Sequence, residues 1–122
     1  MLRLRIFGTK PEDNDAAELA NARYIKLAIE EINKNSEWLK NSDKPYQAML
    51  AHIDILVILA RRFPVNANLL IKQYQTKEWR ETFNDWFTRC EKKIPSKYRE
   101  GIKANADELF TELEEYGNNL RY

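Results

Sequence analysis

The residues best suited to nucleophilic or metal chemistry are His52 and Cys90, the single histidine and the single cysteine of the chain. A Cys/His pair supports covalent catalysis when a third group orients the histidine, and no such group or oxyanion element is recognisable. A metal site needs further ligands at suitable spacing, which are lacking. We therefore expect His52 to be a core histidine hydrogen-bonded to a carbonyl or a polar side chain, and Cys90 to be a small buried hydrophobe.

Structural roles explain the acidic residues better than catalysis or metal binding does. Asp54 lies on the polar side of an apolar stretch, where we expect it to pair with a Lys or Arg of a neighbouring helix and fix the register of the bundle. An enzyme built around His52 and Asp54 is kept as a third functional hypothesis. The acidic run near the C-terminus lacks calcium-loop spacing and is typical of a solvated helix face: Asp107, Glu108, Glu112, Glu114 and Glu115. We expect no enzymatic activity, no cofactor and no metal.

The basic residues are unevenly distributed along the chain. Residues 1–60, 61–103 and 104–122 carry formal charges of −1, +6 and −4, within a total of +1. A basic middle before an acidic end indicates either an anionic partner or packing of one segment against the other, and an ordinary mixed surface is the third interpretation. The candidate phosphate-contacting residues are Arg61, Arg62, Lys72, Lys77, Arg80, Arg89, Lys92, Lys93, Lys97, Arg99 and Lys103.

No sequence motif accompanies these charges. The chain has no helix-turn-helix, zinc-finger or RNA-recognition signature, so we expect contacts that do not depend on base sequence. Trp79, Trp86 and Phe87 would stack on bases if they were exposed. However, they share one arc of a helix with Phe83 and Cys90, which favours packing in the core.

The element that positions these residues is the longest apolar run, Pro45 to Phe63. A projection at about 100° per residue places Gln47, Asp54 and Arg61 on one narrow polar seam, so we expect a helix buried over most of its circumference. The alternative is a strand over Ile53 to Leu59, which is rich in β-branched residues. Pro64 ends the helix because it disfavours helical dihedrals at Phe63. The apolar side is formed by Met49, Leu50, Ile53, Ile55, Leu56, Val57, Ile58, Leu59 and Phe63.

Four further helices complete the expected fold. The first covers about Ala16 to Leu39 and the second Val65 to Tyr74. The third is capped by Thr76 and carries the arc of Trp79, Phe83, Trp86, Phe87 and Cys90, which we call the aromatic stripe. The fourth covers about Ser96 to Tyr116 and stops at Gly117. The first helix has an apolar side formed by Ala22, Ile25, Ile29, Ile32, Ser36 and Leu39, and Asp13 or Asp15 caps it. The last has one formed by Tyr98, Ile102, Ala106, Leu109, Leu113 and Tyr116. We expect the central helix to cover the aromatic stripe.

The sequence thus predicts an all-α, compact bundle of four to five helices around a central buried helix of about residues 45–63. Residues 1–122 form a single domain, with 1–12 an extended or flexible lead-in. Leu2 to Phe7 alternates apolar and basic residues as a strand does. It is either a flexible terminus, or a strand paired with the tail Asn119 to Tyr122 or with another chain, or a remnant of a larger parent protein. No stretch is long and apolar enough for a membrane span and no signal peptide is recognisable, so we expect a cytoplasmic protein.

The basic pairs give the chain one resemblance to a known family. The chain is expected to be a single compact all-α domain without catalytic residues, with a basic ridge formed by Arg61 and Arg62, Lys92 and Lys93, and the K-x-R of 97–99. In this architecture it resembles the small helical subunits of CRISPR surveillance complexes. The resemblance implies a non-enzymatic subunit that contacts nucleic-acid backbone in a larger complex, with other protein subunits as partners and several copies per assembly. The acidic C-terminal helix would then face protein partners. The alternative is a protein-binding adaptor or inhibitor with no nucleic-acid contact.

Overall fold

The computed structural model describes residues 15–41 and 46–117, and these form α-helices joined by short turns. The helices are α1 (Asp15–Asn41), α2 (Tyr46–Arg62), α3 (Pro64–Leu70), α4 (Gln73–Cys90) and α5 (Ser96–Leu113), with a 3₁₀ turn, η1 (Glu91–Lys93), between the last two. The predicted all-α fold is confirmed, and the strand alternative for residues 53–59 is wrong. The expected strand at residues 2–7, its pairing with the tail and the cap at Asp13 lie outside the described residues.

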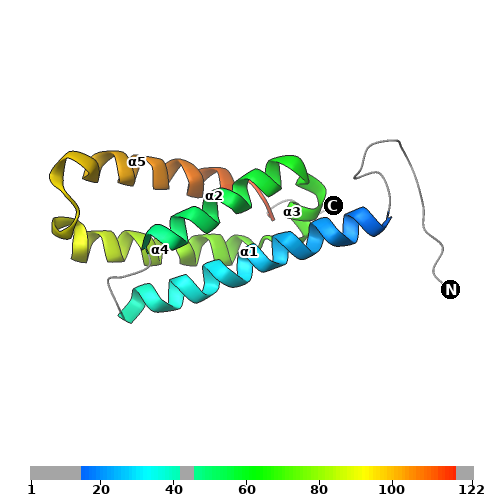
Figure 1. Ribbon diagram of the computed structural model, residues 1–122, viewed down its shortest axis with the longest axis horizontal. Helices are drawn as coiled ribbons and strands as arrows, with labels where there is room; N and C mark the ends of the chain where they lie inside the picture. The colour runs from blue at the N-terminus through cyan, green and yellow to red at the C-terminus, as the bar shows by residue number, and fades with distance from the viewer. Residues whose placement is uncertain (1–14, 42–45, 118–122) are drawn as a thin grey trace.

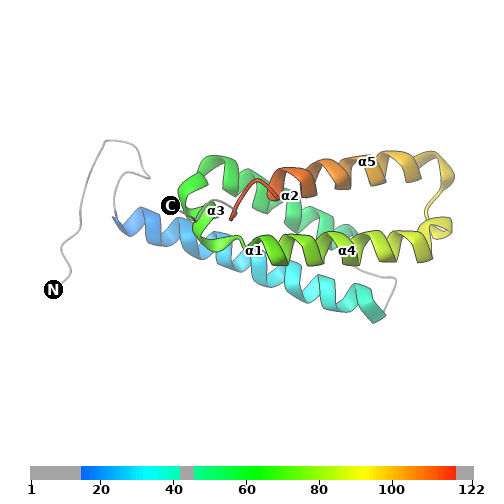
Figure 2. The same ribbon diagram turned by 180° about the vertical axis from the view of Figure 1, so that it is seen from behind.

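The four long helices form an up-down-up-down bundle (Figures 1 and 2). α1 and α2 are antiparallel neighbours, and α4 and α5 form a second antiparallel pair joined by η1. α1 lies beside α4 and α2 beside α5, so that α2 and α4 are diagonally opposite. α3 turns the chain from α2 into α4 at the end of the bundle away from η1. This topology needs only short connections between neighbouring helices.

The predicted apolar side of α1 is confirmed. Ile25, Ile29, Ile32, Ser36 and Leu39 are all buried, as the spacing of three and four residues requires for one face of a helix. They pack against α2 along most of the helix and against α4 on the other side. The expected end of α1 near Leu39 is also confirmed to within two residues.

α2 contributes five fully buried residues to the core, Met49, Ile53, Leu56, Val57 and Ala60. The prediction that this helix is buried over most of its circumference was nevertheless too broad. Ile55 and Ile58 are 47% and 54% exposed. The reason is that α1, α3 and α5 all pack on one side of α2, and the chain supplies no helix to cover the opposite side within the described ranges.

The aromatic stripe of α4 is buried, as its single arc predicted. Trp79, Phe83, Trp86, Phe87 and Cys90 all belong to the core, so stacking of Trp79, Trp86 or Phe87 on bases is ruled out by this arrangement. The expectation that α2 covers the stripe was wrong, since α2 lies diagonally across the bundle. The neighbours α1 and α5 cover it instead: Trp79 Nε1 donates to Asn33 Oδ1 of α1 at 2.8 Å, and the Phe83 ring centroid lies 6.0 Å from that of Phe110.

The start of α4 differs from the prediction. Thr76 is not the helix cap but a buried residue inside the first turns, and α4 begins at Gln73 with extended Lys72 in the N-cap position. Consequently Tyr74 belongs to α4, and the shorter helix α3 ends at Leu70. The side chain of Gln73 donates to the carbonyl of Glu114 at 3.2 Å, which ties this junction to the end of α5.

α5 ends at Leu113 and is followed by a turn that closes at Gly117, the predicted stop. Gly117 has a φ of +77°, a conformation that favours glycine, and its N–H donates to Asn68 Oδ1 at 3.2 Å. The apolar side of α5 is centred differently from the prediction. Phe110 is fully buried, whereas Tyr98 is 52% exposed because it lies in the first turn of α5, near the open end of the bundle.

Candidate nucleic-acid interface

Ion pairs with acidic side chains hold several of the candidate basic residues. Arg61 pairs with Glu112, Arg80 with Glu114 at 2.6 Å, and Lys103 with Asp107 at 2.8 Å. Arg89 lies 3.7 Å from Asp85 and donates to the carbonyl of Leu39 at 3.0 Å. Three of these pairs use the acidic residues of α5 and the turn after it. The basic middle and the acidic end therefore do pack against each other at these positions.

The pair between Arg61 and Glu112 has the most specific geometry. Arg61 Nε and Nη2 each donate to one oxygen of the Glu112 carboxylate at 2.5 Å, a bidentate arrangement that joins α2 to α5. These hydrogen bonds hold the pKa of Glu112 below its ordinary value of 4.5 and raise the pKa of Arg61. Arg61 thus takes the register-fixing role that we expected of Asp54.

This pair predicts a pH-dependent contribution to stability. A carboxylate whose folded pKa is lowered stabilises the fold above its unfolded pKa, near 4.5, and that contribution is lost as the pH falls through the lower folded pKa. We expect Glu112→Gln to lower the urea midpoint at pH 7 and the gap from the wild type to close as the pH falls below 4.5 and through the lowered pKa of Glu112. Glu108→Gln, one turn earlier on α5, is the matched control and should show no such gap. A gap that stays constant over this pH range would contradict the assignment.

Two further candidates use their donors on backbone carbonyls. Arg99 Nε donates to the carbonyl of Ile94 at 2.7 Å and Nη2 to that of Lys92 at 3.2 Å, so this side chain shapes the turn between η1 and α5. Lys72 Nζ donates to the carbonyl of Leu69 at 3.0 Å at the end of α3. Both are structural contacts that satisfy carbonyls at helix ends. Arg99 is consequently a residue that positions its neighbours.

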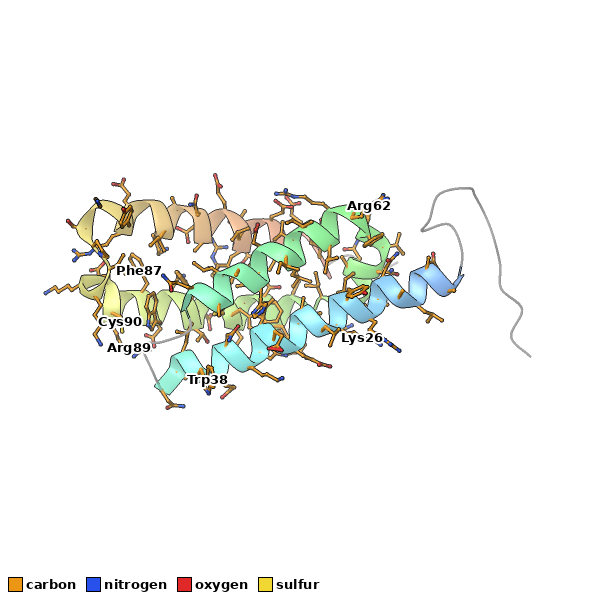
Figure 3. The ribbon with its side chains drawn as sticks, in the orientation of Figure 1. Lys26, Trp38, Arg62, Phe87, Arg89 and Cys90 are labelled. Carbon is orange, nitrogen blue, oxygen red and sulfur yellow. The ribbon has the colours of Figure 1, made fainter. Side chains whose placement is uncertain are left out.

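The remaining candidates lie at opposite ends of the bundle. Figure 3 shows Arg62 at the end of α2, far from the group formed by Phe87, Arg89 and Cys90 at the end of α4. Arg62 lies over the ring of Phe63, with 5.6 Å from its guanidinium carbon to the ring centroid. Lys77 lies in the early turns of α4, about 20 Å along the helix axis from Cys90 at the C-terminal end of that helix. The basic pairs at 61–62 and 92–93 therefore do not lie side by side.

One end gathers exposed lysines beside an exposed aromatic ring. We call it the hairpin tip, defined as Lys92 and Lys93 of η1 with Lys97 and Tyr98 of α5. Lys97 Nζ lies 5.0 Å from the centroid of the Tyr98 ring. Lys92 and Lys97 have no carboxylate partner among the described residues. Sequence periodicity assigned Tyr98 to the core, and its exposure is recognised only from its position in the first turn of α5.

A groove beside the hairpin tip has mixed charge. It has a volume of about 410 Å³ and is lined by Phe87, Glu91, Arg99, Glu100, Lys103, Ala104 and Asp107. Three of these residues are acidic, and Lys103 and Arg99 are already engaged. The groove would repel phosphate as much as attract it, so any anionic contact belongs to the lysines of the tip outside the groove.

Comparison of the chain with protein-family models, with curated proteins and with solved structures found no match. The functional assignment therefore depends on the charges and geometry of this chain alone. None of the helices in residues 15–41 and 46–117 is both long enough and apolar enough to cross a membrane.

His52 and Cys90 lie on different helices, α2 and α4. His52 Nδ1 lies 2.9 Å from Asn35 Oδ1, so His52 is a partly buried histidine bonded to a polar side chain, as predicted. Cys90 is buried, also as predicted. Asp54 is exposed and forms no ion pair within the described helices, so its predicted register role was wrong: it lies on the uncovered side of α2. Within residues 15–41 and 46–117, no three His, Cys, Asp or Glu side chains are placed to hold a metal ion.

Proposed function

We propose that this chain is a non-enzymatic helical subunit of a nucleoprotein assembly and that it contacts nucleic-acid backbone through the hairpin tip. The observation that supports the proposal is the group of exposed lysines at the tip, of which Lys92 and Lys97 have no carboxylate partner in the described structure. Lysines in this state exchange mobile counterions for phosphates at little structural cost. Tyr98 adds a ring on which an unpaired base or a sugar can stack.

The proposal narrows the set of contact residues. Arg61, Arg80 and Lys103 are neutralised by their own acidic partners, and Arg99 is occupied with carbonyls. The contacts would be few and independent of base sequence, which fits a subunit that is brought to nucleic acid by other proteins. A small subunit of a CRISPR surveillance complex, located in the cytoplasm, is one form of such an assembly. Of the basic residues behind that resemblance, Lys92, Lys93 and Lys97 lie together at the tip.

The experiment compares two charge reversals of equal size in the full chain. Lys92→Glu with Lys97→Glu removes the tip charges, and Lys26→Glu with Lys77→Glu makes the same change on exposed lysines of α1 and early α4. Binding of a fluorescent single-stranded RNA of about 30 nucleotides is followed by anisotropy at low salt. We expect the tip variant to bind at least about tenfold more weakly than the control. Each lost phosphate contact means that fewer counterions are released from the RNA on binding, and this release is what favours association. Equal binding by the two variants would contradict the proposal.

A protein-binding adaptor or inhibitor is the second candidate. The exposed apolar side chains of α1 and α2, such as Trp38 and Ile58, favour it, and so do the internal ion pairs that use up part of the basic middle. Under this alternative neither variant binds RNA differently from the wild type. Affinity for a protein partner would instead fall on substitution of exposed apolar residues and change only mildly with salt.

A further inference from the structure

α1 has a second apolar stripe on the side that faces away from the bundle. Ala16, Leu27 and Trp38 recur every eleven residues, which is close to three full turns, so they lie along one line of the helix. Leu27 is two positions from the buried Ile25 and therefore on the opposite side, and it is 47% exposed. Trp38, labelled near the C-terminal end of α1 in Figure 3, is 66% exposed.

The N-terminal half of this stripe is hollowed. A pocket of about 530 Å³ is lined by Ala16, Leu19, Ala20, Arg23, Tyr24 and Leu27, all of which belong to α1. Leu19 and Tyr24 are among the most exposed large apolar residues of the described chain. This half of the outer face of α1 is apolar, while Glu31 and Lys34 lie between Leu27 and Trp38. An exposed apolar surface on a helix that already buries its other side marks an interaction surface.

When two copies of α1 are placed face to face in an antiparallel orientation, opposite charges and side chains of different size meet along the stripe. If a second α1 runs antiparallel across a twofold axis at Leu27, Arg23 faces Glu31 of the other copy, four residues on either side of the axis. At eleven residues from the axis, the small Ala16 faces the large Trp38. Each contact occurs twice because the axis is twofold. A parallel arrangement in register would instead set Arg23 against Arg23 and Trp38 against Trp38.

Arg23 is available for such a contact. It has no ion-pair partner among the described residues, and Glu31 has only a 3.8 Å approach from Lys34 on its own helix. The stripe from Ala16 to Trp38 is about 33 Å long by the helical rise, enough for about six turns of side chains to interdigitate. The stripe thus combines apolar area with opposite charges at matching offsets, the combination that fixes orientation in helix pairs.

We propose that the outer face of α1 binds a second copy of this chain as an antiparallel pair, with the twofold axis at Leu27. The Trp38 end of the stripe lies at the same end of the bundle as the hairpin tip, since Arg89 donates to the carbonyl of Leu39 (Figure 3). None of the tip lysines belongs to the stripe, and the proposal does not depend on nucleic-acid binding. Each dimer would carry two hairpin tips, since neither tip is used in the pairing.

The first test is the mass of the full chain in solution. Sedimentation or light scattering from about 1 to 200 μM should show a species of twice the 14.5 kDa chain mass. Leu27→Glu places a carboxylate from each copy at the axis, where both would be desolvated, and should give the monomer throughout this range. Ile58→Glu, a change of equal size on the exposed side of α2, should leave the dimer intact. A wild type that stays monomeric, or a Leu27→Glu variant as dimeric as the wild type, overturns the proposal and leaves the face to another occupant.

The second test is of orientation and uses charge reversal. Arg23→Glu alone and Glu31→Arg alone should each weaken dimerisation by about tenfold, because each sets two pairs of like charges together. The double variant restores opposite charges across the axis and should recover most of that loss. Circular dichroism confirms that all variants are folded, as both residues lie off the core. A double variant weaker than either single one would exclude the antiparallel register.

Discussion

Replacing Phe110 by alanine is expected to lower the free energy of unfolding by about 3–5 kcal/mol, the largest effect of any substitution considered. Phe110 is fully buried in α5, and its ring lies 6.0 Å from Phe83 of α4, which in turn lies 5.7 Å from Trp86. Removing the ring leaves a cavity between two helices that are held apart by large aromatic neighbours. The surrounding side chains can collapse into it only in part.

The matched control for Phe110 is on the same helix. Tyr98→Ala removes a ring of similar size that is exposed at the hairpin tip, and we expect a change within about 0.5 kcal/mol. Urea unfolding followed by tryptophan fluorescence measures both, since Trp79 and Trp86 lie in the same core. Similar losses for the two variants would mean that α5 does not pack through Phe110.

Replacing Gly117 by alanine is the second large effect, a loss of about 1–3 kcal/mol. The φ of +77° is unfavourable for any residue with a Cβ, and a Cβ added here would lie 2.1 Å from the carbonyl oxygen of Ile71. That oxygen is backbone between α3 and α4 and cannot move aside without disturbing both. The turn after α5 would open, and the hydrogen bond from Gly117 to Asn68 would be weakened.

Gly101→Ala is the control, and it should change the free energy of unfolding in the opposite direction to Gly117→Ala. Gly101 lies within α5, is exposed, and has open space where a Cβ would be, with nothing within 4 Å of that point. Alanine there should raise the free energy of unfolding by about 0.5–1 kcal/mol, because glycine in a helix loses more backbone entropy on folding. Thermal or urea midpoints therefore should move in opposite directions for the two Gly→Ala changes. Midpoints that fall together would contradict the role assigned to Gly117.

The helices and much of the core follow from local spacing alone. Ile25, Ile29 and Ile32 repeat as one side of a helix must, and Trp79 and Phe83 lie on one arc, so their burial is predictable without knowing what covers them. Spacing does not say which helix lies opposite. For that reason α2 was expected to cover the aromatic stripe, whereas Phe110 of α5 and Asn33 of α1 do so.

The candidate site was less predictable, because its chemistry depends on contacts across long sequence separations. The residues near Arg61 in the sequence do not indicate that it pairs with Glu112, which lies 51 positions away. The same is true of Arg80 and Glu114, 34 positions apart. A count of basic residues could therefore locate a charged segment but could not separate the lysines that remain exposed from the arginines that are already paired.

The most direct test of the central claim is the salt dependence of RNA binding by the full chain. With Lys92 and Lys97 in contact with phosphates, the logarithm of the binding constant should fall against the logarithm of salt concentration with a slope of about −1.4 for a single strand. Lys92→Glu with Lys97→Glu should remove most of this slope, and the Lys26→Glu with Lys77→Glu control should retain it. A slope that is the same for both variants and the wild type would contradict phosphate binding at the hairpin tip.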